Sequence, residues 1–195
     1  ILQDDEDVGS LTGTYNSKGR GTLDAVFSME KFPLDYINGF VPDRLIGLRG
    51  VGEGSLTLKG PLDALDINGE VYLDSAHIFS EPYGVDMRFA NDPVLIKNSQ
   101  IKFENFEMFA NNDAPLDVAG SLDFSNLNRM MLNVRMKAEN FEIIDAKENP
   151  RSQVYGKAFV NFYGGMSGPL DQLTMRGKLD VLGSTDMTYV LRESN

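Results

Sequence analysis

The sequence has no cysteine, no tryptophan and a single histidine. Without cysteine the chain can form neither a disulfide nor a thiolate metal site, although this says little about its compartment. No apolar run reaches the roughly 18 residues of a membrane-spanning helix. The first ten residues, ILQDDEDVGS, have neither the basic region nor the apolar core of a signal peptide. Because the chain starts in an acidic segment and stops without a closing element, we expect a fragment of a larger protein.

Positive charge is also scarce. The chain has 18 basic and 29 acidic residues, which gives a net charge of −11. Such a chain repels the phosphates of nucleic acids and the anionic surface of membranes. We therefore expect no nucleic-acid partner.

What the sequence does contain is short segments that alternate strictly between apolar and polar residues. With 42% hydrophobic residues the chain has enough apolar surface to fold. A period of two predicts strands with one apolar face, here over 56–58, 67–73, 101–103, 116–124, 132–136, 158–162 and 175–181. The predicted apolar positions are Leu56, Leu58, Ile67, Val71, Leu73, Ile101, Phe103, Val118, Leu122, Phe124, Leu132, Val134, Met136, Val160, Phe162, Met175, Leu179 and Val181.

Helices have little room in this pattern. FPLDYINGF predicts one or two helical turns before Gly39, and FEIIDAKENP predicts a similar short turn before Pro150. Neither segment is long enough to cover a sheet of seven strands, so the apolar face is covered by the sheet itself, by a partner or by a ligand. We predict an all-β chain with a single domain over residues 1–195, built as an elongated, curved sheet whose concave face is an apolar groove.

One phrase occurs twice. GPLDALDINGEVYL starts at Gly60 and GPLDQLTMRGKLDV starts at Gly168. Each copy predicts a strand, a turn and a second strand. Gly69 and Gly177 fall on the apolar parity, where a missing side chain permits a bend or the close approach of another backbone. Repeated strand units that cannot bury their own apolar face are typical of elongated repeat proteins.

These segments, in this order, resemble the C-terminal domain of the TamB family of AsmA-like translocation and assembly modules. The resemblance is carried by GEGSLTLKGPLDALDINGEVYLDSAHI, PLDVAGSLDF, NFEIIDAKE, VYGKAFVNFYGGMSGPLDQLTMRGKLDVLG and the tail STDMTYVLRES. It implies a periplasmic β-sheet trough, with the full-length protein held in the inner membrane by an N-terminal helix. It also implies an outer-membrane barrel partner of the Omp85 type, and a role in outer-membrane biogenesis with phospholipid or unfolded outer-membrane protein as cargo.

Nothing in the sequence predicts an enzyme. His77 has no second histidine or cysteine with which to hold a metal, and Asp74 and Asp86 are two of many carboxylates available as neighbours. The chain lacks a Gly-x-Ser-x-Gly elbow and a phosphate-binding loop. The acidic stretches QDDED and FANDPV do not have the spacing of a calcium loop. We expect no catalytic residue, metal or cofactor.

Two hypotheses for the function remain. The chain is either a conduit segment, whose hydrophobic groove carries amphipathic cargo, or a structural or adhesive β-repeat segment without a ligand. The conduit requires inward positions that are uniformly apolar, because a charge facing hydrocarbon is costly. The predicted strands meet that requirement.

Overall fold

The computed structural model describes residues 2–3, 6–40, 46–90 and 93–191. Strands make up 69% of the chain, and there is almost no helix. This confirms the all-β prediction. The seven-residue 3-10 helix η1 lies where FPLDYINGF predicts a helical turn. None of the helical segments in the described ranges has the length and hydropathy needed to cross a membrane.

Two sheets are present. The small one pairs β1 (Leu2–Gln3) with β2 (Glu6–Asp7). The large one has 12 strands. Its strands are β3 (Gly9–Asn16), β4 (Thr22–Pro33), β5 (Gly47–Pro61), β6 (Asp66–Ser80), β7 (Val85–Phe89), β8 (Val94–Lys97), β9 (Gln100–Phe109), β10 (Leu116–Asp123), β11 (Met131–Ala146), β12 (Val154–Pro169), β13 (Thr174–Val181) and β14 (Asp186–Tyr189), and η1 (Leu34–Phe40) connects β4 to the segment before β5.

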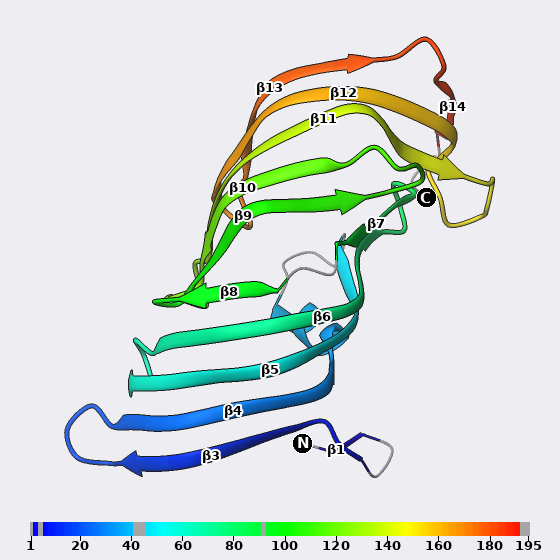
Figure 1. Cartoon of the computed structure of the whole chain (residues 1–195). Coiled ribbons are helices and arrows are strands. Elements are labelled where there is room, and N and C mark those ends of the chain that lie inside the picture. Colours follow the sequence, from blue (N-terminus) through cyan, green and yellow to red (C-terminus); the bar gives the residue numbers. More distant parts are fainter. Residues whose placement is uncertain (1, 4–5, 41–45, 91–92, 192–195) are drawn as a thin grey trace.

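The large sheet is antiparallel and stays open, as Figure 1 shows. Its order follows the chain from β3 at one edge to β13 at the other. The short strands β7 and β8 both lie between β6 and β9, at opposite ends of those strands, and β14 pairs with the first residues of β12. Because most neighbours in space are also neighbours in sequence, the strands stack as a series of hairpins.

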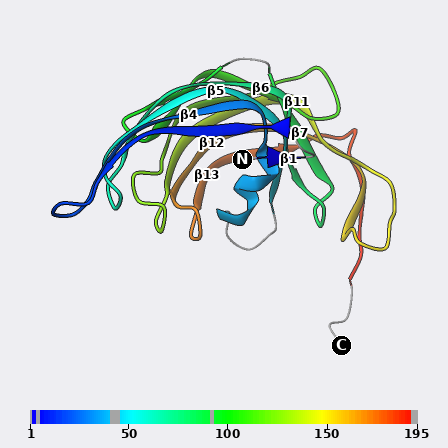
Figure 2. The same ribbon diagram turned by 90° about the horizontal axis from the view of Figure 1, so that it is seen from below.

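The sheet curls into an arch, which Figure 2 shows end-on. Four of its strands contain a β-bulge of the same kind, in which three steps along the bulged strand match two steps on its neighbour. Each bulge contains a non-glycine residue with a positive φ of 50° or 51°: Lys31 on β4, Ser75 on β6, Asn105 on β9 and Asn140 on β11. Bulges bend and twist the strand that carries them. The four bulges therefore contribute to the curvature.

The repeated phrase forms the same structure twice, as predicted. In the first copy the Ala64 N–H donates to the Pro61 carbonyl, and in the second the Gln172 N–H donates to the Pro169 carbonyl, both at 2.9 Å. A Cβ placed on Gly69 would lie 2.1 Å from a backbone oxygen of β5, and one on Gly177 would lie 2.4 Å from a backbone oxygen of β12. Both glycines are therefore sites where another backbone approaches closely.

The second predicted helical turn is wrong. Residues 141–146 belong to β11, and the chain leaves the sheet only after Ala146. The bulge at Asn140 shifts the inward positions by one, so that Phe141 continues the apolar face begun by Ala138. Strict alternation is lost at that point, which made the segment look helical. The paired Gly164 and Gly165 do not interrupt β12.

Candidate functional site: the apolar concave face

The inward residues of the large sheet pair with one another across most of its width. Residues directly opposite in neighbouring antiparallel strands lie on the same face. One continuous row runs through Leu11, Phe27, Leu56, Gly69, Ile96, Ile101, Leu122, Leu132 and Gly168. Every member of this row is apolar or glycine. The row therefore connects β3 to β12 without crossing a polar side chain.

Three shorter rows carry the same face to the edge at β13. They are Phe103, Gly120, Val134, Met166 and Met175; then Met108, Leu116, Ala138, Phe162 and Leu179; then Phe141, Val160 and Val181. We call the concave surface formed by these four rows the trough. The trough lies under the arch, on the side where η1 lies in Figure 2.

The structure places the predicted groove residues on this face. Leu58 and Ile67 oppose each other, Val71 opposes Gly54, Leu73 opposes Gly52, and Val118 opposes Met136. The other predicted positions belong to the rows given above, except Phe124. Phe124 comes just after β10, and its N–H donates to the carbonyl of Ser99 at 3.0 Å. Sequence reasoning missed Leu11 and Phe27, although β3 and β4 also alternate with a period of two.

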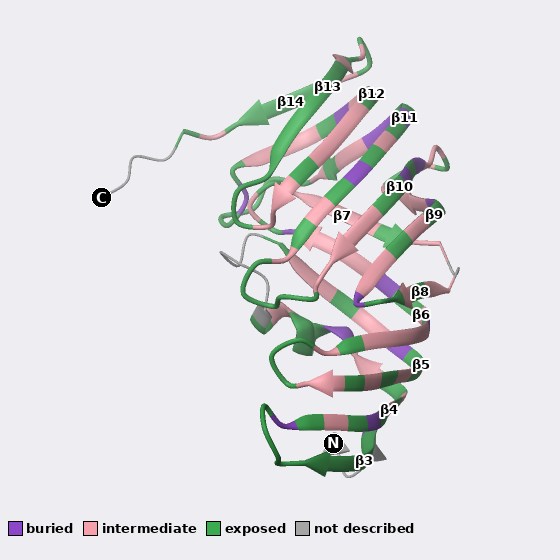
Figure 3. Cartoon of the chain, turned by 90° about the vertical axis from the view of Figure 1, so that its left-hand side faces the viewer, coloured by how far each residue is buried: buried purple, intermediate pink, exposed green. Residues whose placement is uncertain are grey.

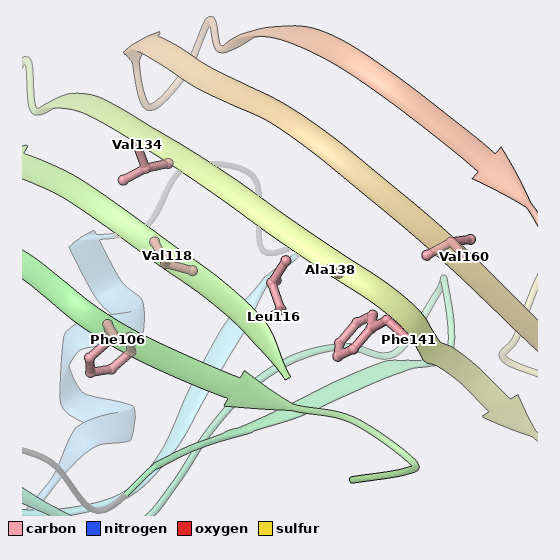
Figure 4. Packing of buried hydrophobic residues seen from close by; sticks show 7 residues of the cluster. All are labelled: Phe106, Leu116, Val118, Val134, Ala138, Phe141 and Val160. Atoms are coloured by element: carbon pink, nitrogen blue, oxygen red, sulfur yellow. The ribbon is translucent and has the colours of Figure 1, made fainter. Parts of the chain in front are cut away.

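Burial of the trough is deepest beside the bulge of β11. Phe141 is 1% exposed and belongs to one cluster with Phe106, Leu116, Val118, Val134, Ala138 and Val160, which Figure 4 shows side by side on four strands. Met87 and Phe89 of β7 pack against this cluster. This part of the trough is a core.

Towards the two edges the same face is uncovered. Leu179 is 58% exposed, and Leu11, Met175 and Val181 are similarly open. Figure 3 shows β3, β13 and β14 as almost entirely exposed strands. Large exposed apolar side chains that continue a buried row are unusual for a sheet that has no partner.

The convex face is mainly polar. Lys137, Glu139 and Tyr163 form a group there, in which the Tyr163 hydroxyl donates to Glu139 and Lys137 lies 3.5 Å from the same carboxylate. The bond from Tyr163 lowers the pKa of Glu139 and raises that of Tyr163, while the negative charge of Glu139 raises the pKa of Lys137. A depression of about 470 Å³ over β9, β10 and β11 is lined by Glu107, Asp117 and Lys137 among others. Exposed apolar side chains on this face include Val26, Tyr72, Leu95 and Met131, and Arg49 and Arg88 lie over the rings of Phe79 and Phe109.

His77 also lies on the convex face. Its Nδ1 is 2.8 Å from Asp86, and Arg49 binds the other oxygen of the same carboxylate at 2.5 Å. Of its two candidate partners the structure brings Asp86 to His77, whereas Asp74 contacts Ser75. The carboxylate of Asp86 is therefore engaged in an ion pair with Arg49. The absence of a catalytic site stays a prediction.

A metal site was not expected, and the described part of the chain contains no group of three or more His, Cys, Asp or Glu side chains that could hold an ion. The acidic stretches QDDED and FANDPV include residues 4–5 and 91–92, which lie outside the described residues.

Ser99 is a structural position that the sequence did not reveal. It is buried in the hairpin between β8 and β9, and its hydroxyl accepts from the Ile67 N–H at 3.0 Å and donates to the Leu65 carbonyl at 2.7 Å. Its own N–H donates to the Ile67 carbonyl at 2.9 Å. Ser99 thus attaches β8 and β9 to β6. This contact lies between the hairpins formed by β3 to β6 and those formed by β9 to β13.

Comparisons of the chain with protein-family models, with curated proteins and with solved structures find no match.

Proposed function

We propose that the chain is a conduit segment that carries amphipathic cargo, with the apolar part of the cargo lying in the trough. The observation that carries this proposal is the continuity of the four apolar rows from β3 to β13, uncovered at both edges. Contact with such a surface contributes roughly 25 cal/mol per Å² removed from water and needs no directional bonds. Cargo held in this way can slide along the parts of the trough that are not packed into the core around Phe141.

The trough favours an acyl chain over an extended polypeptide. The backbone groups of the inner strands are already paired with their neighbours, so the face offers no partner to another backbone. A polypeptide lying on it would bury its own N–H and C=O groups at about 1–3 kcal/mol for each one left unpaired. An acyl chain has no such groups. An unfolded outer-membrane protein would instead have to pair with an edge strand.

The resemblance to the TamB family supplies the setting of this proposal. In that setting the chain is a periplasmic part of a longer protein, and lipid moves along it between the inner membrane and an outer-membrane barrel of the Omp85 type. The competing proposal is a structural or adhesive segment whose exposed edges bind no cargo.

Photocrosslinking in cells distinguishes these proposals. A crosslinking amino acid is placed at Phe162 or Leu179 in the trough, and at Asn133 or Lys178 on the convex face. Asn161 is a poor control because its side chain accepts the N–H of Asn140 at 2.7 Å and supports a bulge. Capture of phospholipid from the trough positions alone supports the conduit. Equal capture from both faces, or none from the trough, would leave the structural segment. Capture of polypeptide in place of lipid would keep the trough and change its cargo.

A further inference from the structure

The helix η1 lies inside the trough. Figure 2 shows it beneath the arch, and Figure 1 shows it beside β5 and β6. It follows directly after β4 and packs on β5, where Leu34 lies near Gly52 and Asn38 bonds to Leu48. Leu56, the member of the long apolar row on β5, lies further along the same strand, so cargo that follows this row from β3 towards β9 passes beside η1.

The helix is held there by a fitted contact. Leu34, at its first position, is buried and lies above Gly52 of β5. A Cβ placed on Gly52 would be 3.5 Å from Leu34 Cδ2 and 3.2 Å from Val71 Cγ1. Leu34 therefore packs directly over residue 52, at a distance that is an ordinary van der Waals contact.

A pair of hydrogen bonds fixes the other end of the helix. The Asn38 side-chain amide donates to the Leu48 carbonyl at 2.9 Å, and the Leu48 N–H donates back to Asn38 Oδ1 at 2.7 Å. With Leu34 anchored at the start and Asn38 at the end, η1 is attached to the sheet at two points. It is a fixed obstacle in the trough.

Three residues lie between these anchors: Asp35 is acidic and exposed, and Tyr36 and Ile37 offer apolar surface. Tyr36 is 45% exposed and Ile37 is 40% exposed. The Tyr36 ring makes an edge contact with Phe32 at 5.5 Å, and Phe32 makes the same kind of contact with Phe27 at 5.6 Å. Tyr36 thus extends the series of contacting aromatic rings from β4 to η1.

We propose that η1 is a size-selecting constriction, at which Tyr36 and Ile37 contact passing cargo and limit how many acyl chains enter side by side. This inference rests on the proposed function of the trough. The inference assigns the selection of cargo to Tyr36 and Ile37. Both residues lie outside the four rows, on the helix η1. Removing both side chains widens the passage without touching the rows, because neither residue belongs to them.

The test uses three lipids that share phosphoglycerol chemistry and differ in chain number: lysophosphatidylglycerol with one acyl chain, phosphatidylglycerol with two, and cardiolipin with four. The purified chain is mixed with equal amounts of the three, and bound lipid is identified by native mass spectrometry. The test variant is Tyr36→Ala/Ile37→Ala. Its matched control is Tyr72→Ala/Val26→Ala, which removes a tyrosine (55% exposed) and a β-branched residue (42% exposed) from the convex face. Circular dichroism checks that both variants fold.

We expect the wild-type chain to bind the one-chain lipid at least about tenfold better than cardiolipin, and the η1 variant to reduce that ratio to about twofold or less. The control variant keeps the wild-type ratio. One-chain binding by the wild type with the same ratio in all three proteins would overturn the constriction and leave the conduit intact. If the wild type binds none of the three lipids, the conduit fails and the constriction with it.

Discussion

Leu179 on β13 lies directly opposite Phe162 on β12, yet Leu179 is mostly exposed while Phe162 is half-buried. The two side chains belong to one row, so the difference arises because β13 has no strand beyond it. The edge of the trough is therefore the place where its apolar surface can be changed without disturbing the core. The first prediction uses this position.

Leu179→Glu should reduce lipid binding by at least about tenfold, because it places an unpaired charge beside the acyl chain. The free energy of unfolding should change by less than about 0.5 kcal/mol, since the side chain is exposed. Thr174→Glu adds the same charge on the convex side of the same strand and should leave binding unchanged. Lipid binding is measured by native mass spectrometry and stability by urea denaturation. Equal loss of binding in both variants would show that net charge, and not the trough, controls the cargo.

Phe141→Ala should lower the free energy of unfolding by about 3–5 kcal/mol, because it opens a cavity in the best-packed part of the sheet. Leu179→Ala, which removes a similarly apolar side chain from the uncovered edge, should cost less than about 1 kcal/mol. Urea denaturation of the two variants provides the comparison. Similar costs would mean that the edge is covered in solution.

Ser99→Ala should lower the free energy of unfolding by about 1–3 kcal/mol, because the Leu65 carbonyl and the Ile67 N–H both lose a buried partner. Ser28→Ala, at an exposed position on the convex side of β4, should change it by less than about 0.5 kcal/mol. A Ser99 variant as stable as the wild type would show that water replaces the hydroxyl.

Gly69→Ala should cost about 1–3 kcal/mol, because the added Cβ would collide with the backbone oxygen of Ser55. Gly177→Ala, at the equivalent place in the second copy of the repeated phrase, should be destabilising for the same reason. Gly183 is the control, since a Cβ there would meet nothing within 4 Å. Thermal denaturation of the three variants compares the sites, and a harmless Gly69→Ala would contradict the close approach.

Asp123 provides a test by pH. The Ser125 hydroxyl and N–H donate to its carboxylate at 2.7 and 2.9 Å and hold the pKa of Asp123 below its usual value. A lowered folded pKa stabilises the fold above the unfolded value of about 3.9, and this contribution is lost as the pH falls through the folded pKa. Ser125→Ala should raise the pKa of Asp123 and shrink that acid-sensitive contribution. An NMR titration of the carboxyl carbon measures the shift, and an unchanged pKa would assign the effect to the Ser125 N–H alone.

Much of the fold follows from period-two alternation, because a residue that faces inward on one strand pairs with an inward residue on the next. Alternation does not extend through a bulge. At each of the four bulges the apolar spacing changes from two to three, as between Phe103 and Phe106 or between Ala138 and Phe141. That spacing is visible in the sequence, and after Asn140 it resembles the spacing of a helix. The position of η1 in the trough could not be predicted, since it depends on contacts with Gly52 and Leu48, which are distant in sequence.

The bulges also determine how the curvature of the sheet can change between related sequences. Each one adds a single residue, and deleting Asn140 would restore alternation between Ala138 and Phe141 and bend β11 less at that point, while the second register shift of the strand, between Glu142 and Ile144, would remain. The width of the arch therefore depends on whether each extra residue is present. An in-frame insertion or deletion of one codon would change that width in a single step. Related chains would be expected to differ in width by such steps while keeping the same apolar rows.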